Sequence, residues 1–166
     1  FQVTAAFLEL YQGLAGIPLS FGFPNRRAMR LGERLGHYAE VGALRELRWS
    51  PLGRRPRLSH NLRFLDPQQA SDRDAIDKLW VAMAGDLEAG VLGVRDWDYL
   101  RHRYMNHPDL HYELVLVRSR LTSTPLGLLV LRKEADAVAL IDLVAPLKNI
   151  PPLVVQARRL AGLWGK

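Results

Sequence analysis

The chain has 166 residues, of which 48% are hydrophobic and 24% are charged, a composition typical of a globular protein with a sizeable core. It contains no cysteine, which excludes a disulfide framework, a thiol nucleophile and a zinc-thiolate site. No apolar run is long enough to span a bilayer and no signal-peptide pattern is present, so we expect a cytoplasmic protein without a membrane partner.

The net charge of +6 is unevenly distributed along the chain. Ten arginines against five acidic residues give residues 1–66 a net charge of +5, whereas residues 67–166 carry only +1. Such an excess suits an anionic partner, for example a nucleic acid or a phosphorylated cofactor. Arginines outnumber lysines by 19 to 4, however, so solubility and a general preference for arginine explain the charge equally well.

The first part of the chain predicts two helices and two strands. Apolar residues at helical spacing indicate a helix over residues 3–15, and residues 17–23 are typical of a buried strand. Asn25 is a suitable cap for the next helix, which Gly36 ends. A loose alternation of apolar and polar residues predicts a strand over residues 39–49.

A segment rich in proline, arginine and polar residues follows at 50–70, and we interpret it as a linker. Its neighbourhood holds the arginines of a conceivable nucleic-acid patch: Arg45, Arg48, Arg54, Arg55, Arg57 and Arg63. Only Trp49 and Phe64 lie near them as aromatic residues for stacking on bases, and no helix-turn-helix or RNA-binding signature is present. A solvated linker is therefore the favoured interpretation.

The second part predicts two helices, three strands and a last helix. Ser71 is a candidate cap for an amphipathic helix, and "RDWDYLRHRYMNHP" indicates a second helix that stops before Pro108. Three apolar segments with short polar connections predict an antiparallel meander, at residues 112–118, 125–132 and 137–143. Pro152 then opens a helix with an apolar face.

Together these elements resemble the two halves of the GCN5-related N-acetyltransferase fold, in swapped order. "FPNRRAMRLGERLG" is similar to the family's motif of Asn, two residues, Ala, two residues, Leu, Tyr and then Leu-Gly a turn later. The matching residues are Asn25, Ala28, Leu31, Leu35 and Gly36. The meander resembles the family's second to fourth strands, with Gly127 in the third and with Val144 and Pro146 at the exit from the fourth.

The resemblance implies an α+β fold of the acyl-CoA N-acyltransferase type, with a mainly antiparallel central sheet flanked by helices. Residues 1–49 correspond to the C-terminal half of one unit, 50–70 to the linker, and 71–166 to the N-terminal half of a second unit. From this order of the halves we expect the middle of a longer tandem protein, and the start at Phe1 rather than Met fits a processed product, a truncated chain or a gene fragment. The two halves could also close as one permuted sheet, within one chain or between two chains as a homodimer.

The resemblance implies transfer of an acetyl group from acetyl-CoA, or a related acyl group from its CoA thioester, to an amine of a small molecule or protein. Two departures place that activity in doubt for this segment. "APLKNIPPLVV" lacks the glycines of the family's pyrophosphate loop, and its prolines have no N–H donors. Gly32 stands where many members carry a general-acid tyrosine, with Tyr38 near in sequence. A non-catalytic binding or assembly module and a basic nucleic-acid-binding domain are the alternative functions.

Asn25, Arg26 and Arg27 are the candidate cofactor-binding residues. A helix N-terminus carries roughly half a positive charge, so an exposed basic residue in the first turn costs about 0.3–1 kcal/mol. An anion at this end would reverse that sign, and the resemblance makes the anion part of coenzyme A. The alternative is that Asn25 only caps the helix while the two arginines point into water.

Other chemistry-bearing residues have plainer interpretations, and no catalytic residue is assigned. Asp142 lies in an apolar strand, where it acts either as a general base or, the favoured interpretation, as the partner of a nearby arginine. The spacing of His102, His107 and His111 fits no metal motif, so we expect surface histidines and no metal site. Three aromatic residues are expected to pack in the core: Trp97, Tyr99 and Tyr104.

Overall fold

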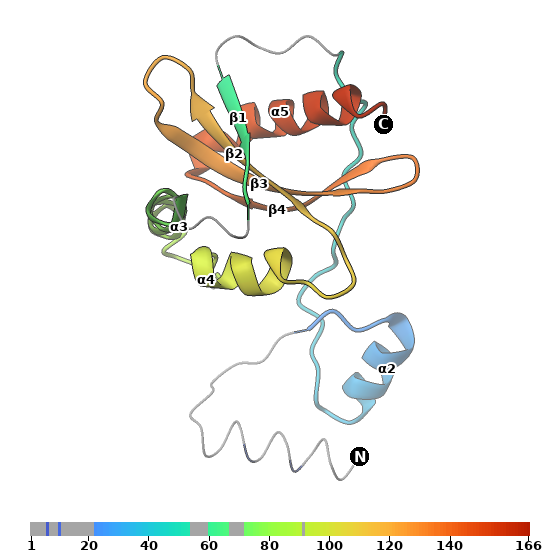
Figure 1. Ribbon diagram of the computed structural model, residues 1–166. Helices are drawn as coiled ribbons and strands as arrows, with labels where there is room; N and C mark the ends of the chain where they lie inside the picture. Colours follow the sequence, from blue (N-terminus) through green and yellow to red (C-terminus); the bar gives the residue numbers. More distant parts are fainter. Residues whose placement is uncertain (1–5, 7–9, 11–21, 54–59, 67–71, 91) are drawn as a thin grey trace. The chain divides into compact units, whose positions relative to one another are not determined.

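The computed structural model describes residues 6, 10, 22–53, 60–66, 72–90 and 92–166, and it divides the chain into two units, Phe1–Leu47 and Arg48–Lys166. The second unit is an α+β structure with a four-stranded antiparallel sheet in the order β1-β2-β3-β4 (Figure 1). Its strands are β1 (His60–Phe64), β2 (Glu113–Ser119), β3 (Pro125–Lys133) and β4 (Val138–Val144). Its helical elements are α3 (Arg73–Asp86), α4 (Trp97–Leu100), the π-helical turn η3 (Arg101–Met105), the 3-10 turn η4 (Leu147–Asn149) and α5 (Ile150–Leu163).

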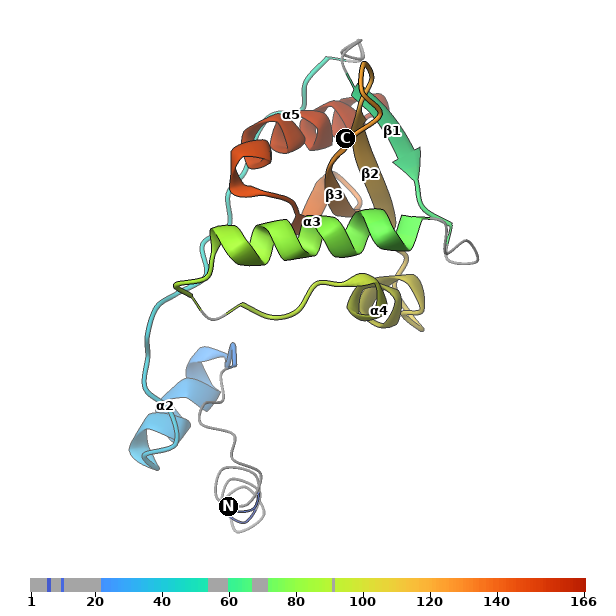
Figure 2. The ribbon, with the colours of Figure 1, turned by 90° about the vertical axis from the view of Figure 1, so that its left-hand side faces the viewer.

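The predicted meander is confirmed, and helices cover both of its faces. Figure 2 shows α3 and α4 on one side of the sheet and α5 on the other. Alternate residues of β2 pack on opposite sides of the sheet, because successive side chains of a strand point to opposite faces. Leu114 and Leu116 pack with α3 and α4, whereas Val115 and Val117 pack with α5. Burial on both faces explains why these strands read as continuous apolar runs rather than as alternating ones.

A β-bulge in β4 determines which of its side chains face α4. Val130 pairs with Asp142 and Leu131 pairs with Leu140, so Ile141 is the extra residue. A bulge of this kind bends the strand and re-aims its side chains. Leu140 thereby joins the apolar cluster on the α5 side, while Asp142 lies opposite Val130 on the side of α3 and α4.

The linker predicted at 50–70 is corrected by the structure, because His60–Phe64 forms the edge strand β1. It pairs with β2 in antiparallel register from His60 opposite Ser119 to Phe64 opposite Val115. Only Leu62 of this strand packs against the core cluster on the α5 side, so its sequence carries almost no apolar alternation. Strand β1 therefore forms because it pairs with β2, which is already buried. The local sequence alone does not predict this strand.

The segment before β1 is also held to this unit. The N–H of Leu52 donates to the carbonyl of Arg158 in α5 at 3.0 Å, and Arg158 Nε donates to the carbonyl of Ser50 at 2.9 Å. Gly162 lies directly beneath the Leu52 carbonyl, where an added Cβ would collide with it. Residues 50–52 are thus a backbone strap along α5 rather than free chain.

In the first unit the predicted helix is confirmed as α2 (Arg26–Arg34), with Asn25 as its N-cap and Gly36 beyond its end at a positive φ of 71°. The strand predicted over 39–49 is wrong: these residues have no regular structure. Val41, Leu44 and Leu47 are largely exposed, and none of the described strands belongs to this unit, so no strand pairing supports a strand here.

Several predicted features lie outside the described residues. They include the Ser71 cap, almost all of the helix over 3–15, and residues 17–21 of the first predicted strand. Residues 22 and 23 are described and do not form a strand. All four strands of the sheet lie within residues 60–144, so the described part of residues 1–49 adds nothing to a permuted sheet.

Gly127→Ala should lower the free energy of unfolding by about 1–3 kcal/mol, because overpacking a filled core strains its neighbours. A Cβ at Gly127 would contact the Leu153 side chain and lie 2.8 Å from the Cβ of Ala145. The control is Gly85→Ala in α3, where nothing lies within 4 Å and the better helix propensity of alanine should make the change neutral or stabilising. Urea denaturation measures both, and equal effects of the two variants would contradict the packing.

Candidate functional site

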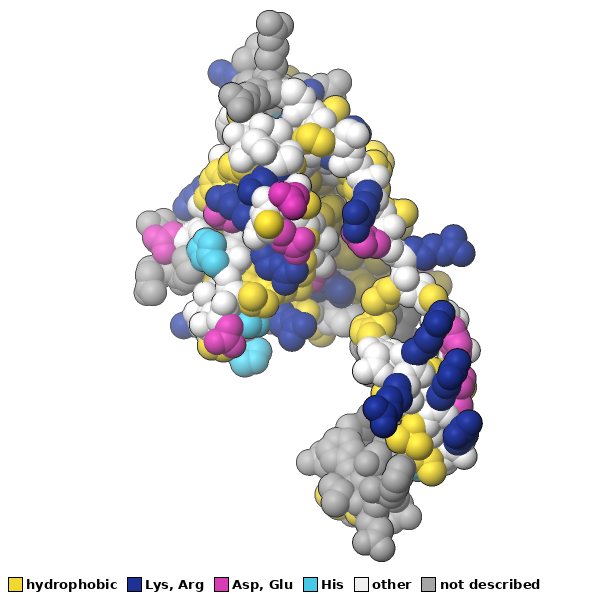
Figure 3. All heavy atoms as spheres, turned by 90° about the vertical axis from the view of Figure 1, so that its right-hand side faces the viewer, with side chains coloured by type: hydrophobic (Ala, Val, Ile, Leu, Met, Phe, Trp, Pro, Cys, Tyr) yellow, Lys and Arg dark blue, Asp and Glu magenta, His cyan; other side chains and the backbone are white. Residues whose placement is uncertain are grey.

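The N-terminus of α2 brings together the predicted residues Asn25, Arg26 and Arg27. Asn25 Oδ1 accepts a hydrogen bond from the N–H of Ala28 at 2.9 Å, so Asn25 does cap the helix. Both arginines are exposed, and the first turn contains no acidic residue. Figure 3 shows basic side chains gathered on the surface of this unit. Within the described residues, no carboxylate pairs with Arg26 or Arg27.

Donors at this helix end can hold an anion. The first N–H groups of a helix have no intrahelical acceptor, which leaves those of Arg26 and Arg27 available beside their guanidinium groups. The amide nitrogen of Asn25 is a further donor, because only its oxygen serves the cap. These donors and the helix dipole suit a phosphate group, so the residues fit part of coenzyme A. On the same helix, Leu31 and Leu35 of the family-like motif are nearly half exposed.

Tyr38 occupies the space beside Gly32. Its ring covers this glycine so closely that an added Cβ would lie only 2.7 Å from Tyr38 Cε2 and closer still to Cδ2. Gly32 is buried as a result, although it belongs to a mostly exposed helix. A side chain at position 32 and the ring of Tyr38 therefore cannot be present together, and the phenol near this turn comes from Tyr38.

The loop before α5, in contrast to the N-terminus of α2, is poorly suited to bind an anion. The N–H of Leu147 donates to Asp86 Oδ2 at 2.7 Å, so a carboxylate of the protein already takes the position of an anion. Asn149 Nδ2 donates to the carbonyl of Leu126 at 2.8 Å. Pro151 and Pro152 lie in the first turn of α5 and have no N–H. These residues do not fit a diphosphate, which agrees with the departure noted in the sequence.

The carboxylate of Asp142 accepts hydrogen bonds from two side chains distant in sequence and from the N–H of the next residue. Arg95 Nε donates to both carboxylate oxygens, at 3.0 and 3.2 Å, which confirms the expected pairing with an arginine. The Tyr104 hydroxyl donates to Oδ2 at 2.9 Å, and the N–H of Leu143 donates to Oδ1. Burial and then the Asp142 carboxylate raise the pKa of Tyr104 well above its usual value, so the hydroxyl remains a donor. With its oxygens engaged, Asp142 serves as a structural anchor rather than as a base.

Asp72 is a buried carboxylate that the sequence analysis missed. It is only 3% exposed and pairs with Arg63 of β1 at 3.2 Å and with Arg118 of β2 at 3.0 Å. Arg63, assigned above to the linker, thus joins β1 to the start of α3. No sequence spacing links these groups, since Arg118 is 46 residues from Asp72. The remaining linker arginines Arg54, Arg55 and Arg57 lie outside the described residues.

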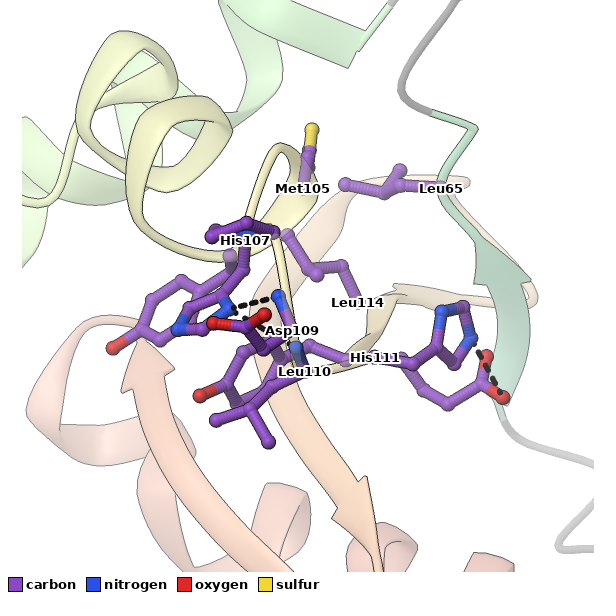
Figure 4. A pocket seen from close by; sticks show the side chains of 11 residues that line it. Leu65, Met105, His107, Asp109, Leu110, His111 and Leu114 are labelled. Atoms are coloured by element: carbon purple, nitrogen blue, oxygen red, sulfur yellow. Dashed lines mark hydrogen bonds and ion pairs between the residues drawn. The ribbon is translucent and has the colours of Figure 1, made fainter.

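The histidines do not gather into a metal site. Among the residues that the structure describes, no three His, Cys, Asp or Glu side chains are placed to hold a metal ion. His107 Nδ1 accepts hydrogen bonds from the N–H groups of Asp109 and Leu110, at 3.1 and 3.0 Å (Figure 4). The ring therefore carries its proton on Nε2, and it closes the turn after η3. His111 is exposed and lies 3.7 Å from the carboxylate of Glu113.

Comparisons with protein-family models, with curated proteins and with solved structures find no match to this chain. In the described part of the chain, the helices are too short or too polar to cross a membrane. The resemblance to acetyltransferases accordingly rests on the Asn25–Gly36 motif and on the order of the elements.

The pairing of Arg95 with Asp142 should appear in a double-mutant cycle. Arg95→Met leaves a nearly buried carboxylate without its cation and should lower the free energy of unfolding by about 2–4 kcal/mol. Asp142→Asn removes the charge, so Arg95→Met should cost at least about 1 kcal/mol less in that background. Thermal and urea denaturation give these values, and additive effects would show that the pair does not couple.

Proposed function

We propose that this chain is part of an N-acyltransferase related to the GCN5-related N-acetyltransferases. It would transfer an acetyl or related acyl group from a CoA thioester to an amine. In this reaction the amine nitrogen attacks the thioester carbonyl carbon, the carbon–sulfur bond breaks to release the CoA thiolate, and a base takes the proton from nitrogen. In the family that the chain resembles, backbone N–H groups of a core strand polarise the carbonyl oxygen as negative charge develops on it.

The observation that supports this proposal best is the N-terminus of α2. It combines a side-chain cap at Asn25, two arginines in the first turn and no acid to neutralise them. Two cations at the positive end of a helix dipole are unfavourable unless an anion is bound there. The phosphates of coenzyme A supply that charge, and acetyl-CoA is therefore the proposed cofactor of the Phe1–Leu47 unit.

For the Arg48–Lys166 unit, a second function is favoured by a separate observation. The N–H of Leu147 is bonded to Asp86, and two prolines follow in the first turn of α5. These features oppose phosphate binding at this loop. We propose that this unit is a non-catalytic module with an acyltransferase-like arrangement, which supports assembly or binds a partner.

Arg26→Ala combined with Arg27→Ala should weaken binding of coenzyme A by about tenfold or more, because each variant removes a charge that faces the phosphates. Isothermal titration calorimetry on the chain measures the affinity. The matched control, Arg30→Ala with Arg34→Ala, removes the same charge from the same helix but away from its first turn. Equal affinity for both double variants and the unaltered chain would refute the cofactor site, and undetectable binding throughout would leave only the module.

The division between the two units predicts a pattern of NMR shifts. Addition of coenzyme A should move the amide resonances of Arg26, Arg27 and Ala28 and leave those of Leu147 and Asn149 unchanged, because Asp86 and the prolines oppose a diphosphate at the second loop. Asp86→Ala should shift the Leu147 resonance without creating binding there. Saturable shifts at Leu147 and Asn149 in the unaltered chain would contradict the non-catalytic assignment.

A further inference from the structure

A hollow of about 370 Å³ opens in the Arg48–Lys166 unit, where the turn after η3 meets the beginning of β2. Figure 4 shows Leu65 and Met105 on one side of it and His107 with Asp109 on another. Its volume lies within the range of small-molecule sites, which are concave and mostly apolar with a few polar groups. The residues proposed above to bind coenzyme A lie in the other unit and take no part in it.

Aromatic rings build much of its wall. The rings of Tyr104 and Tyr112 meet edge to face, with centroids 5.1 Å apart, and Tyr112 meets His107 in the same manner at 5.6 Å. Tyr104 is fixed by its hydrogen bond to Asp142, and His107 is fixed by two backbone N–H groups. These contacts fix the positions of the rings, so the hollow has a preformed aromatic wall of the kind that attracts cations.

The residues that line the hollow carry acidic groups without Lys or Arg, whereas the chain as a whole is basic. The sequence holds 23 Lys and Arg against 17 Asp and Glu, yet the eleven lining residues include two acids and neither Lys nor Arg. Glu113 is engaged by Lys133 at 2.8 Å. Asp109 is exposed and lines the hollow, and it has no cationic partner among the described residues. The hollow thus disfavours anions and retains one carboxylate for a ligand.

We infer that this hollow binds a small organic cation, an ammonium group on an apolar or aromatic body. The ammonium group pairs with the Asp109 carboxylate and lies against the rings of Tyr112 and His107. The apolar body fills the space beside Leu114, where its burial supplies most of the affinity. Because His107 Nδ1 accepts two backbone hydrogen bonds, that atom presents no proton to the ligand. This site stands whether or not the chain transfers an acyl group.

Three probes of nearly equal shape and different charge test the inference on the whole chain: 2-phenylethylammonium, 2-phenylethanol and 3-phenylpropionate. Titration is followed by NMR at millimolar probe concentrations. The ammonium probe should shift the amides of residues 107–114 and bind at least about threefold more tightly than the alcohol, and the carboxylate should bind most weakly. Equal affinity of all three probes, or no shifts in this segment, would overturn the inference.

Two variants that change the net charge by the same amount separate the role of Asp109 from a general electrostatic effect of the protein. Asp109→Asn should weaken binding of the ammonium probe about threefold and leave the alcohol unchanged. Asp136→Asn, exposed in the turn between β3 and β4, changes the net charge equally and should have no effect. Tyr112→Leu should weaken both probes by removing a ring from the wall. Identical behaviour of the two asparagine variants would exclude the proposed pairing.

Discussion

Burial of β2 and β3 on both faces is the constraint on which the Arg48–Lys166 unit depends. Residues Val115–Val117 and Leu128–Leu131 are fully buried, so each face of these strands needs a helical layer. Helices α3 and α4 supply one layer and α5 the other, through Ile76, Leu79 and Leu100 on one side and Leu153 and Leu160 on the other. Gly127 allows this close approach, because α5 and the exit of β4 leave no room for a side chain there.

Three aspartates fasten the segments around this core. Asp72 joins β1 and β2 to the start of α3, Asp86 holds the loop before α5, and Asp142 holds Arg95 and Tyr104. Each aspartate pairs with groups distant in sequence, so these contacts occupy its carboxylate oxygens. A carboxylate whose oxygens already accept several hydrogen bonds is a poor base. Among the residues that the structure describes, these three carboxylates are therefore engaged in contacts that stabilise the unit.

The two units differ in what their helix N-termini hold. At α2 the orphan donors and two arginines face outward, with only the Asn25 cap satisfied internally. At the loop before α5 the protein's own Asp86 and two prolines take the place of such donors. The N-terminus of α2 is thus open to an anion, whereas the N-terminus of α5 is closed to one. This contrast is the physical basis of the proposal that one unit binds a cofactor and the other a partner.

The sequence by itself determined the features that depend on neighbours along the chain. Asn25 caps α2, the apolar runs form the antiparallel meander, and α5 follows with prolines in its first turn, because caps, periodicity and proline act within a few residues. Tertiary structure alone decided the rest. Edge strand β1 exists through its pairing with β2, the bulge at Ile141 directs Asp142 toward Arg95, and the hollow beside Asp109 is closed where Leu65 meets residues 104–114. None of these follows from local pattern, since the groups that make them are brought together only when the sheet is covered.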